Sequence, residues 1–196
     1  MKIYQVMIDV NRLRSATTIN WQDHTDEMMR LGVPLADCWR TLALKSYKPK
    51  RPTGLFIQIA SGDFILTDQA EKDQVLLKLL EPDGEFLPVT VDGKPMRFHN
   101  ITRFTDCLDY EKSQWRWDMV GKVPGGITHP RFIPEKVPAG SMFRLMEYPG
   151  PRYIATDPKL APTADFYQWY QHQRYDGLLF KLMWNSEKPD ELGGFY

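Results

Sequence analysis

The sequence predicts an α+β fold: mainly an antiparallel β-sheet with a few helices packed on it, in a single domain spanning residues 1–196. Three observations support this prediction. The length of 196 residues suits one domain, and a hydrophobic share of 42% is enough to build a substantial core. Short apolar or alternating runs bounded by turn residues, which are typical of strands, outnumber the helical patterns.

The first 50 residues contain one expected strand and one expected helix. Residues 2–10 alternate in part between apolar and polar side chains and predict the opening strand. Residues 21–31 carry acids at the start and are followed by Gly32, as expected for a short helix. The basic, proline-bearing residues 47–54 predict a connector.

The next segment predicts two short strands and a helix. Residues 55–60 and 64–66 form apolar runs on either side of a Ser-Gly-Asp turn. Either Thr67 or Asp68 can cap the following helix, and Glu71 completes a capping box if Asp68 is the cap. Apolar side chains at helical spacing continue this helix to a Pro-Asp-Gly turn: Val75, Leu76, Leu79 and Leu80.

A hairpin dominates the centre of the chain. Residues 86–91 and 96–104 read as strands, and the Asp-Gly-Lys turn at residues 92–94 is a strong hairpin signal. Pro95 weakens the edge of the second strand, because proline donates no backbone hydrogen bond. Residues 113–117 predict a further strand, in which Trp115 and Trp117 share one face.

The last third of the chain begins with a loop-rich stretch. Residues 120–138 hold many glycines and prolines, with room for one short strand at residues 131–133. Strands are expected at residues 141–147, 152–155 and 177–184.

A helix is expected between the last two of these strands. Thr156 and Asp157 before Pro158 predict the start of a helix. Residues 165–174 either continue it or form a second helix after Pro162.

Charge and cysteine content narrow the class of protein. Lys and Arg total 25 and Asp and Glu total 25, whereas strong nucleic-acid binders carry a basic excess, so we expect no direct nucleic-acid partner. Cys38 and Cys107 leave one disulfide open but suggest no disulfide framework. The N-terminus has no leader pattern and no run is apolar enough to span a membrane, so we expect a cytoplasmic protein without membrane contact.

The sequence shows no catalytic or metal-binding signature. The histidines lack metal-ligand spacing and there is no nucleophile elbow, so neither a metal nor a cofactor is expected. Cys107 has acidic neighbours and reads as a small buried residue rather than a nucleophile. The alternative to a non-enzymatic function is a carboxylate–histidine site formed by His99, Asp106 and Asp109, next to Tyr110.

Residues 106–113, with the sequence DCLDYEKS, resemble the central signature of immunity-protein family eleven of the bacterial polymorphic-toxin systems. Shorter matches extend the resemblance over about residues 57–184, whereas residues 1–50 match less well. The shorter matches are the strand, cap and helix of residues 63–80, Phe-Leu-Pro-Val at residues 86–89, Phe143-Arg144, and Gly-Leu-Leu-Phe at residues 177–180. The resemblance implies a cytosolic protein that binds and neutralises a cognate toxin, often a nuclease, from a type VI or contact-dependent system. It implies no enzymatic activity, no cofactor and no active-site residues.

Acids and large rings are the expected contact residues for such a toxin. A nuclease cleft is basic, so local acids would speed encounter, and exposed aromatic rings anchor many interfaces. The residues expected to contact the partner are Asp23, Asp26, Glu27, Glu81, Asp83, Glu85, Trp115, Trp117, Trp169 and Tyr170. The alternatives are that the acids are solvated turn or helix-start charges and that the rings build the core. An adaptor or a binder of small ligands that uses the aromatic helix is a third hypothesis.

Overall fold

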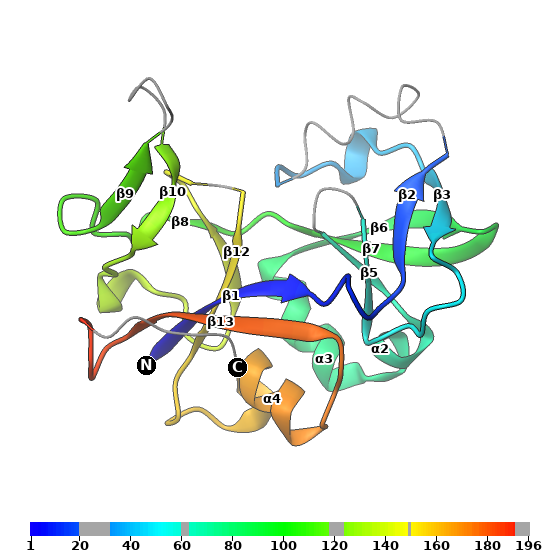
Figure 1. The fold of residues 1–196 in the computed structure, drawn as a ribbon. Helices are drawn as coiled ribbons and strands as arrows, with labels where there is room; N and C mark the ends of the chain where they lie inside the picture. Colours follow the sequence, from blue (N-terminus) through cyan, green and yellow to red (C-terminus); the bar gives the residue numbers. More distant parts are fainter. Residues whose placement is uncertain (20–31, 60–62, 118–123, 149, 191–196) are drawn as a thin grey trace.

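A closed barrel and an open sheet lie side by side in this protein, with the described α-helices along one side of both (Figure 1). The computed structural model describes residues 1–19, 32–59, 63–117, 124–148 and 150–190. The fold is α+β and dominated by sheet, as predicted, but the strand pairing is mixed rather than purely antiparallel. The helix expected at residues 21–31 lies outside the described residues.

The open sheet has five strands in the order β13-β1-β12-β11-β8. These strands are β13 (Leu178–Asn185), β1 (Lys2–Ile8), β12 (Arg152–Thr156), β11 (Met142–Leu145) and β8 (Phe104–Thr105). All neighbours are antiparallel except β11 and β8, which run parallel. The register places Gln5 opposite both Tyr153 and Lys181.

The barrel closes in the order β2-β3-β6-β7-β5-β4. Its strands are β2 (Ser15–Thr18), β3 (Leu42–Tyr47), β6 (Gly84–Val91), β7 (Lys94–Ile101), β5 (Phe64–Leu66) and β4 (Phe56–Gln58). The predicted hairpin is confirmed between β6 and β7, where Asp92 and Gly93 have φ of 51° and 78°, as a type I′ turn requires. Pro95 is tolerated in β7 because β5 pairs only from Arg97 onward.

A two-stranded ribbon of β9 (Gln114–Trp117) and β10 (Pro124–His129) extends away from the sheet (Figure 1). The expectation that residues 120–138 form a loop is wrong for β10, which is a strand although it begins with Pro124 and two glycines. Residues 131–133 form no strand: Phe132 makes only an isolated bridge to Leu108. The 3-10 helix η4 (Pro134–Lys136) follows.

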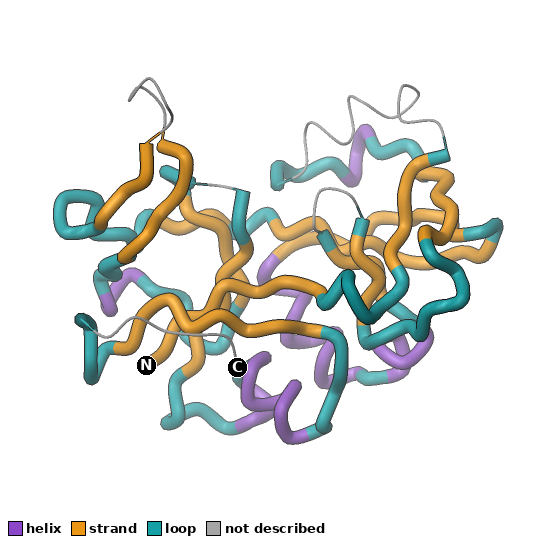
Figure 2. Tube along the Cα trace, in the orientation of Figure 1, coloured by secondary structure: helices purple, strands orange, loops and turns teal. Residues whose placement is uncertain are grey.

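The α-helices of the described chain are α2 (Asp68–Lys72), α3 (Gln74–Leu80) and α4 (Phe166–His172), which Figure 2 shows gathered on one side. The single helix expected from Thr67 or Asp68 is interrupted at Asp73, whose side chain caps α3. Thr67 does not cap with its side chain and instead donates to the Leu55 carbonyl oxygen. Glu71 forms an ion pair with Arg97 rather than a capping box.

Three further 3-10 helices connect the described elements: η2 (Ala36–Cys38), η3 (Glu81–Asp83) and η5 (Pro162–Ala164). The helix expected to start at Thr156 does not form there. Instead α4 begins after Asp165, whose side chain caps it by accepting a hydrogen bond from the Gln168 N–H. The second alternative, a helix after Pro162, is therefore confirmed.

One hydrophobic cluster joins the barrel to the sheet. It unites Val6 of β1 and Phe180 of β13 with Phe64 of the barrel, Leu76 of α3 and Phe166 of α4. A second cluster fills the barrel, and a third lies on the opposite face of the sheet around Ile3, Cys107, Phe143, Tyr153 and Trp184. The barrel and the sheet thus share a core. In the described part of the chain, no helix has the length and apolar content to cross a membrane.

Candidate functional site

The segment that carries the family resemblance is fixed to the core at its start. Cys107 and Leu108 are buried in the third cluster, and the Ile133 N–H donates to the Cys107 carbonyl oxygen at 2.8 Å. Burial raises the pKa of the Cys107 thiol to about 12, which keeps it protonated. Cys107 is therefore a small buried residue, as predicted, and the structure joins it to no disulfide with the exposed Cys38.

Directly after this anchor, residues 109–113 form a hydrogen-bonded loop, here called the 109–113 loop. The Asp109 N–H donates to the Arg131 carbonyl oxygen at 2.8 Å, and the Ser113 hydroxyl donates to the Asp109 carbonyl oxygen at 2.6 Å. The Asp109 carboxylate accepts from the Lys112 N–H at 3.1 Å and lies 2.8 Å from Lys112 Nζ. The Lys112 side chain holds the pKa of Asp109 below its usual range. These contacts tie the loop to itself and to the backbone of Arg131.

Two aromatic rings, here called the aromatic edge, lie on the 109–113 loop and on β9. Tyr110 is 46% exposed and packs against Trp115 with 4.7 Å between ring centroids. The Trp115 indole also packs against the third core cluster. The backbone of Trp117 lies two residues further along β9, and its side chain is outside the described part of the structure. The aromatic edge is thus accessible and held in place from below.

The structure describes three of the six predicted acidic residues, Glu81, Asp83 and Glu85, and these three lie in different environments. Asp23, Asp26 and Glu27 lie outside the described residues. Glu81 is exposed on η3. The Glu85 carboxylate is occupied by the backbone, since it accepts from the N–H groups of residues 35 and 36 at 2.6 and 3.1 Å.

Asp83 is fully buried, so its predicted place at a partner surface is wrong. Its carboxylate accepts from the Met142 N–H at 2.7 Å and lies 3.2 Å from Arg103 Nη1. The turn around it is packed tightly: a Cβ at Gly84 would lie 2.0 Å from the Asn100 carbonyl oxygen. Burial raises the pKa of Asp83 to about 7, although Met142 and Arg103 oppose this shift.

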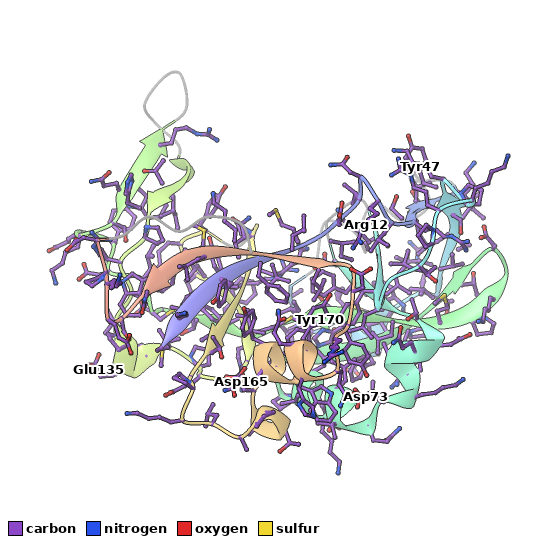
Figure 3. All side chains as sticks on the ribbon, turned by 60° about the horizontal axis from the view of Figure 1, so that its bottom comes forward. Arg12, Tyr47, Asp73, Glu135, Asp165 and Tyr170 are labelled. Atoms are coloured by element: carbon purple, nitrogen blue, oxygen red, sulfur yellow. The ribbon has the colours of Figure 1, made fainter. Side chains whose placement is uncertain are left out.

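The aromatic side chains of helix α4 make contacts within the protein. Tyr170 is buried, its hydroxyl accepts from the Leu178 N–H at 2.9 Å, and burial raises its pKa to about 12. The prediction of Tyr170 as a contact residue is therefore wrong. Trp169 is half-buried and donates from Nε1 to Asp73 at 2.7 Å. In Figure 3, Asp73 lies between α4 and the green helices α2 and α3, at the junction of the latter two.

The residues of the alternative enzymatic site engage different neighbours. His99 is fully buried in the barrel wall, with Nε2 3.0 Å from the Leu80 carbonyl oxygen, and burial lowers its pKa to about 4. Asp106 is exposed and lies 2.8 Å from Lys136 Nζ, while Asp109 holds its own loop. The described contacts therefore bring no general acid–base pair together from these three side chains.

An ion cluster that the sequence analysis missed links the barrel to the sheet. Asp63, buried just before β5, accepts from Arg144 Nη2 of β11 at 2.6 Å and from Arg152 Nε of β12 at 2.8 Å. Arg144 Nε also donates to the Ile101 carbonyl oxygen at 3.1 Å. Because the two arginines lie 81 and 89 residues away along the chain, no local pattern indicated this cluster.

Three of the cavities on the described surface have volumes of about 290 to 360 Å³. One of about 360 Å³ lies at the mouth of the barrel, where Lys94 pairs with Asp68 at 2.6 Å. One of about 290 Å³ lies beside the stacked rings of Tyr4 and Tyr167. The third, of about 330 Å³, lies between the sheet and the β9–β10 ribbon. Among the described residues, no three His, Cys, Asp or Glu side chains lie close enough together to hold a metal ion.

The fold and its surface define an α+β protein in which a small barrel and an open sheet support an ordered surface loop. A scan against models of known protein families gives no match, and no curated protein matches the chain. The family resemblance of residues 106–113 therefore stays a prediction.

Proposed function

We propose that this protein is an immunity protein. It acts in the cytoplasm by binding a cognate secreted antibacterial toxin, delivered by a type VI or contact-dependent system, and neutralises it by occlusion without turning over a substrate. The toxin class that fits includes nucleases. The observation that carries the proposal is the position of the family-like segment: Cys107 and Leu108 anchor it in the core, and it then presents the aromatic edge on a fixed loop.

The 109–113 loop has the properties expected of a binding surface. A loop already held by internal hydrogen bonds loses little conformational entropy when it binds, which favours affinity. Tyrosine and tryptophan are enriched among the residues that dominate binding energy. Glu111 and Lys112, which follow the exposed Tyr110, carry charges of both signs, which suit the polar rim of an interface.

Co-expression with the product of the neighbouring gene, which the proposal expects to be the toxin, tests the proposal. We expect rescue of growth and co-purification of the two proteins. Replacing Tyr110 by Ala should weaken the complex by roughly tenfold or more, as for a typical energetic centre of an interface. The matched control is Tyr47→Ala, because Tyr47 is 55% exposed but lies on the barrel.

Two outcomes would contradict the proposal. One is that the co-expressed toxin kills cells equally well with and without this protein. The other is that the purified protein consumes a metabolite and loses this activity in His99→Ala or Asp109→Asn, which would favour the enzymatic alternative.

A further inference from the structure

The cavity of about 360 Å³ lies at the mouth of the barrel, at the end next to α2 (Figure 1). Its volume falls at the lower end of the range of small-molecule sites, and the mouths of barrels commonly hold such sites. The described barrel is interrupted after Ile19 and Ile59, which follow the other ends of β2 and β4. The strand ends that form this mouth are therefore described throughout.

The inner face of the barrel changes from apolar to polar at this mouth. Successive inner positions of a strand are two residues apart. Below the mouth, these positions hold apolar side chains that belong to the second core cluster or pack against it: Ala16, Leu44, Ile65 and Met96. One inner position nearer the mouth, four polar side chains line the cavity: Arg14, Ser46, Thr67 and Lys94.

The floor of the cavity stays apolar. Ile57 and Val91, which are 3% and 5% exposed, line it together with Met96. These side chains come from β4, β6 and β7. They offer a surface on which an aliphatic group of a ligand would be shielded from water.

Two opposite charges, those of Arg14 and Asp92, line the cavity without pairing with each other in the described structure. Arg14 Nη2 donates to the Pro49 carbonyl oxygen at 2.6 Å, and the guanidinium group carries further N–H donors. The Asp92 carboxylate accepts from the Ser46 N–H at 2.9 Å and from the Ser46 hydroxyl at 2.5 Å. These hydrogen bonds hold the pKa of Asp92 below its usual range, and the positive charge of Arg14 adds to the effect. The two charges are thus neighbours separated by more than an ion-pair distance.

The other two charged side chains of the described lining pair with each other. Lys94 Nζ lies 2.6 Å from the Asp68 carboxylate, and this contact holds the pKa of Asp68 below its usual range. Within the described lining, Arg14 and Asp92 are therefore the charges whose attraction a ligand can satisfy. A ligand placed between them needs a negative and a positive group close together.

We propose that the mouth of the barrel binds a free amino acid with an aliphatic side chain. Arg14 binds the carboxylate of this ligand and Asp92 binds its ammonium group, since both contacts are charge-assisted hydrogen bonds. The aliphatic side chain packs against the floor of the cavity. The site lies on the barrel, separate from the aromatic edge, and its occupation needs no toxin.

Isothermal titration calorimetry of the purified protein tests the site with L-valine, L-leucine, L-isoleucine and L-methionine. We expect saturable binding of at least one of them near one molecule per chain. Two analogues of leucine isolate its charged groups: 4-methylpentanoate lacks the ammonium group and 3-methylbutylamine lacks the carboxylate. Each should bind roughly tenfold more weakly than leucine or worse, because it satisfies one charge of the pair.

Asp92→Asn removes the negative charge at a turn position with a φ of 51°, which asparagine tolerates. The variant should weaken amino-acid binding roughly tenfold or more and lose the preference for leucine over 4-methylpentanoate. Its control is Asp37→Asn, at an exposed acid on η2.

Arg14→Gln should weaken amino-acid binding by a similar factor and gives a second test if Asp92→Asn does not fold. Its matched control is Arg51→Gln, because Arg51 also donates to a backbone carbonyl oxygen, that of Val10, at 2.7 Å. The proposal is overturned if none of the four amino acids binds saturably, if either analogue binds as tightly as leucine, or if the control variants weaken binding as much as the cavity variants do.

Discussion

Asp83 and His99 are buried, titratable side chains with shifted pKa values. The two shifts make the free energy of unfolding depend on pH in opposite directions. Burial raises the pKa of Asp83 from 3.8 to about 7 and lowers that of His99 from 6.5 to about 4. Both shifts favour the neutral form in the folded state. Each residue therefore gives a pH-dependent contribution to the free energy of unfolding that an uncharged replacement removes.

Asp83→Asn is expected to change how stability depends on pH. The folded state binds the Asp83 proton more tightly than the unfolded state, so the contribution of Asp83 falls as the pH rises from about 4 to about 7. The free energy of unfolding of the native protein minus that of the variant should decrease over this range by on the order of 4 kcal/mol. Urea unfolding at several pH values measures it, and parallel pH curves for the two proteins would refute the burial argument.

His99→Phe is expected to show the opposite trend. The unfolded state binds the His99 proton more tightly, so the contribution of His99 is complete above pH 6.5 and is lost as the pH falls toward about 4. Phe keeps an aromatic ring against Phe86, whose centroid lies 5.1 Å from that of His99. As the pH falls from 6.5 to about 4, the free energy of unfolding of the native protein should decrease by on the order of 3 kcal/mol relative to that of the variant. An NMR titration showing a protonated His99 in the folded protein at pH 5.5 would contradict this expectation.

At the scale of elements, Asp73 connects two helices that are far apart in sequence. Its carboxylate caps α3 by accepting from the N–H groups of Val75 and Leu76 at 2.9 and 3.0 Å. It also accepts from Trp169 Nε1 at 2.7 Å and from the Tyr175 hydroxyl at 2.5 Å. Burial by itself would raise the pKa of Asp73, but these hydrogen bonds outweigh it and hold the pKa below its usual value.

Asp73→Ala should destabilise the protein by about 3 kcal/mol, because the variant loses a helix cap and two hydrogen bonds to a charged group. Asp37→Ala is the control: Asp37 is an exposed acid in the first turn of η2, where substitution should cost about 0.5 kcal/mol or less. Urea unfolding of both variants makes the comparison. Equal losses in the two would show that Asp73 does not join α3 to α4 as described.

Elements whose signal is local were predictable from the sequence. β1, β5, the β6–β7 hairpin and β13 each rest on a short apolar pattern or on a turn with demanding backbone angles. β10 was missed because its Pro-Gly-Gly start is typical of a loop, and only pairing with β9 makes it a strand. The parallel pairs β2–β4 and β3–β6, which close the barrel, join distant segments and leave no local signature.

The same distinction applies to the candidate site. The burial of Cys107 was predicted from its small side chain and from acidic neighbours that disfavour a thiolate, whereas the burial of Asp83 depends on Met142, which lies 59 residues away. The sequence did not indicate which of Trp169 and Tyr170 is buried, because the position of β13 decides which ring of α4 is covered.

At the scale of the whole molecule, the shared core and the Asp63 ion cluster predict that barrel and sheet unfold together. Asp63→Asn removes the negative charge that both Arg144 and Arg152 contact. The substitution should lower the free energy of unfolding by about 3 kcal/mol or more, because two buried cations lose the Asp63 carboxylate. Amides of β7 in the barrel and of β12 in the sheet should lose protection from hydrogen exchange by equal amounts. A loss confined to one of the two strands would show that they unfold separately.

The position of β1 also sets the order of events during synthesis. This strand precedes every other described strand in the sequence, yet both of its neighbours, β12 and β13, belong to the last quarter of the 196 residues. Every strand of the barrel has been translated by residue 101, so the barrel can close while the ribosome is still extending the nascent polypeptide. Residues 2–8 can pair with β12 and β13 only after the segment ending at residue 185 has emerged from the exit tunnel. Only then is the third core cluster beneath the 109–113 loop complete, because it includes Trp184.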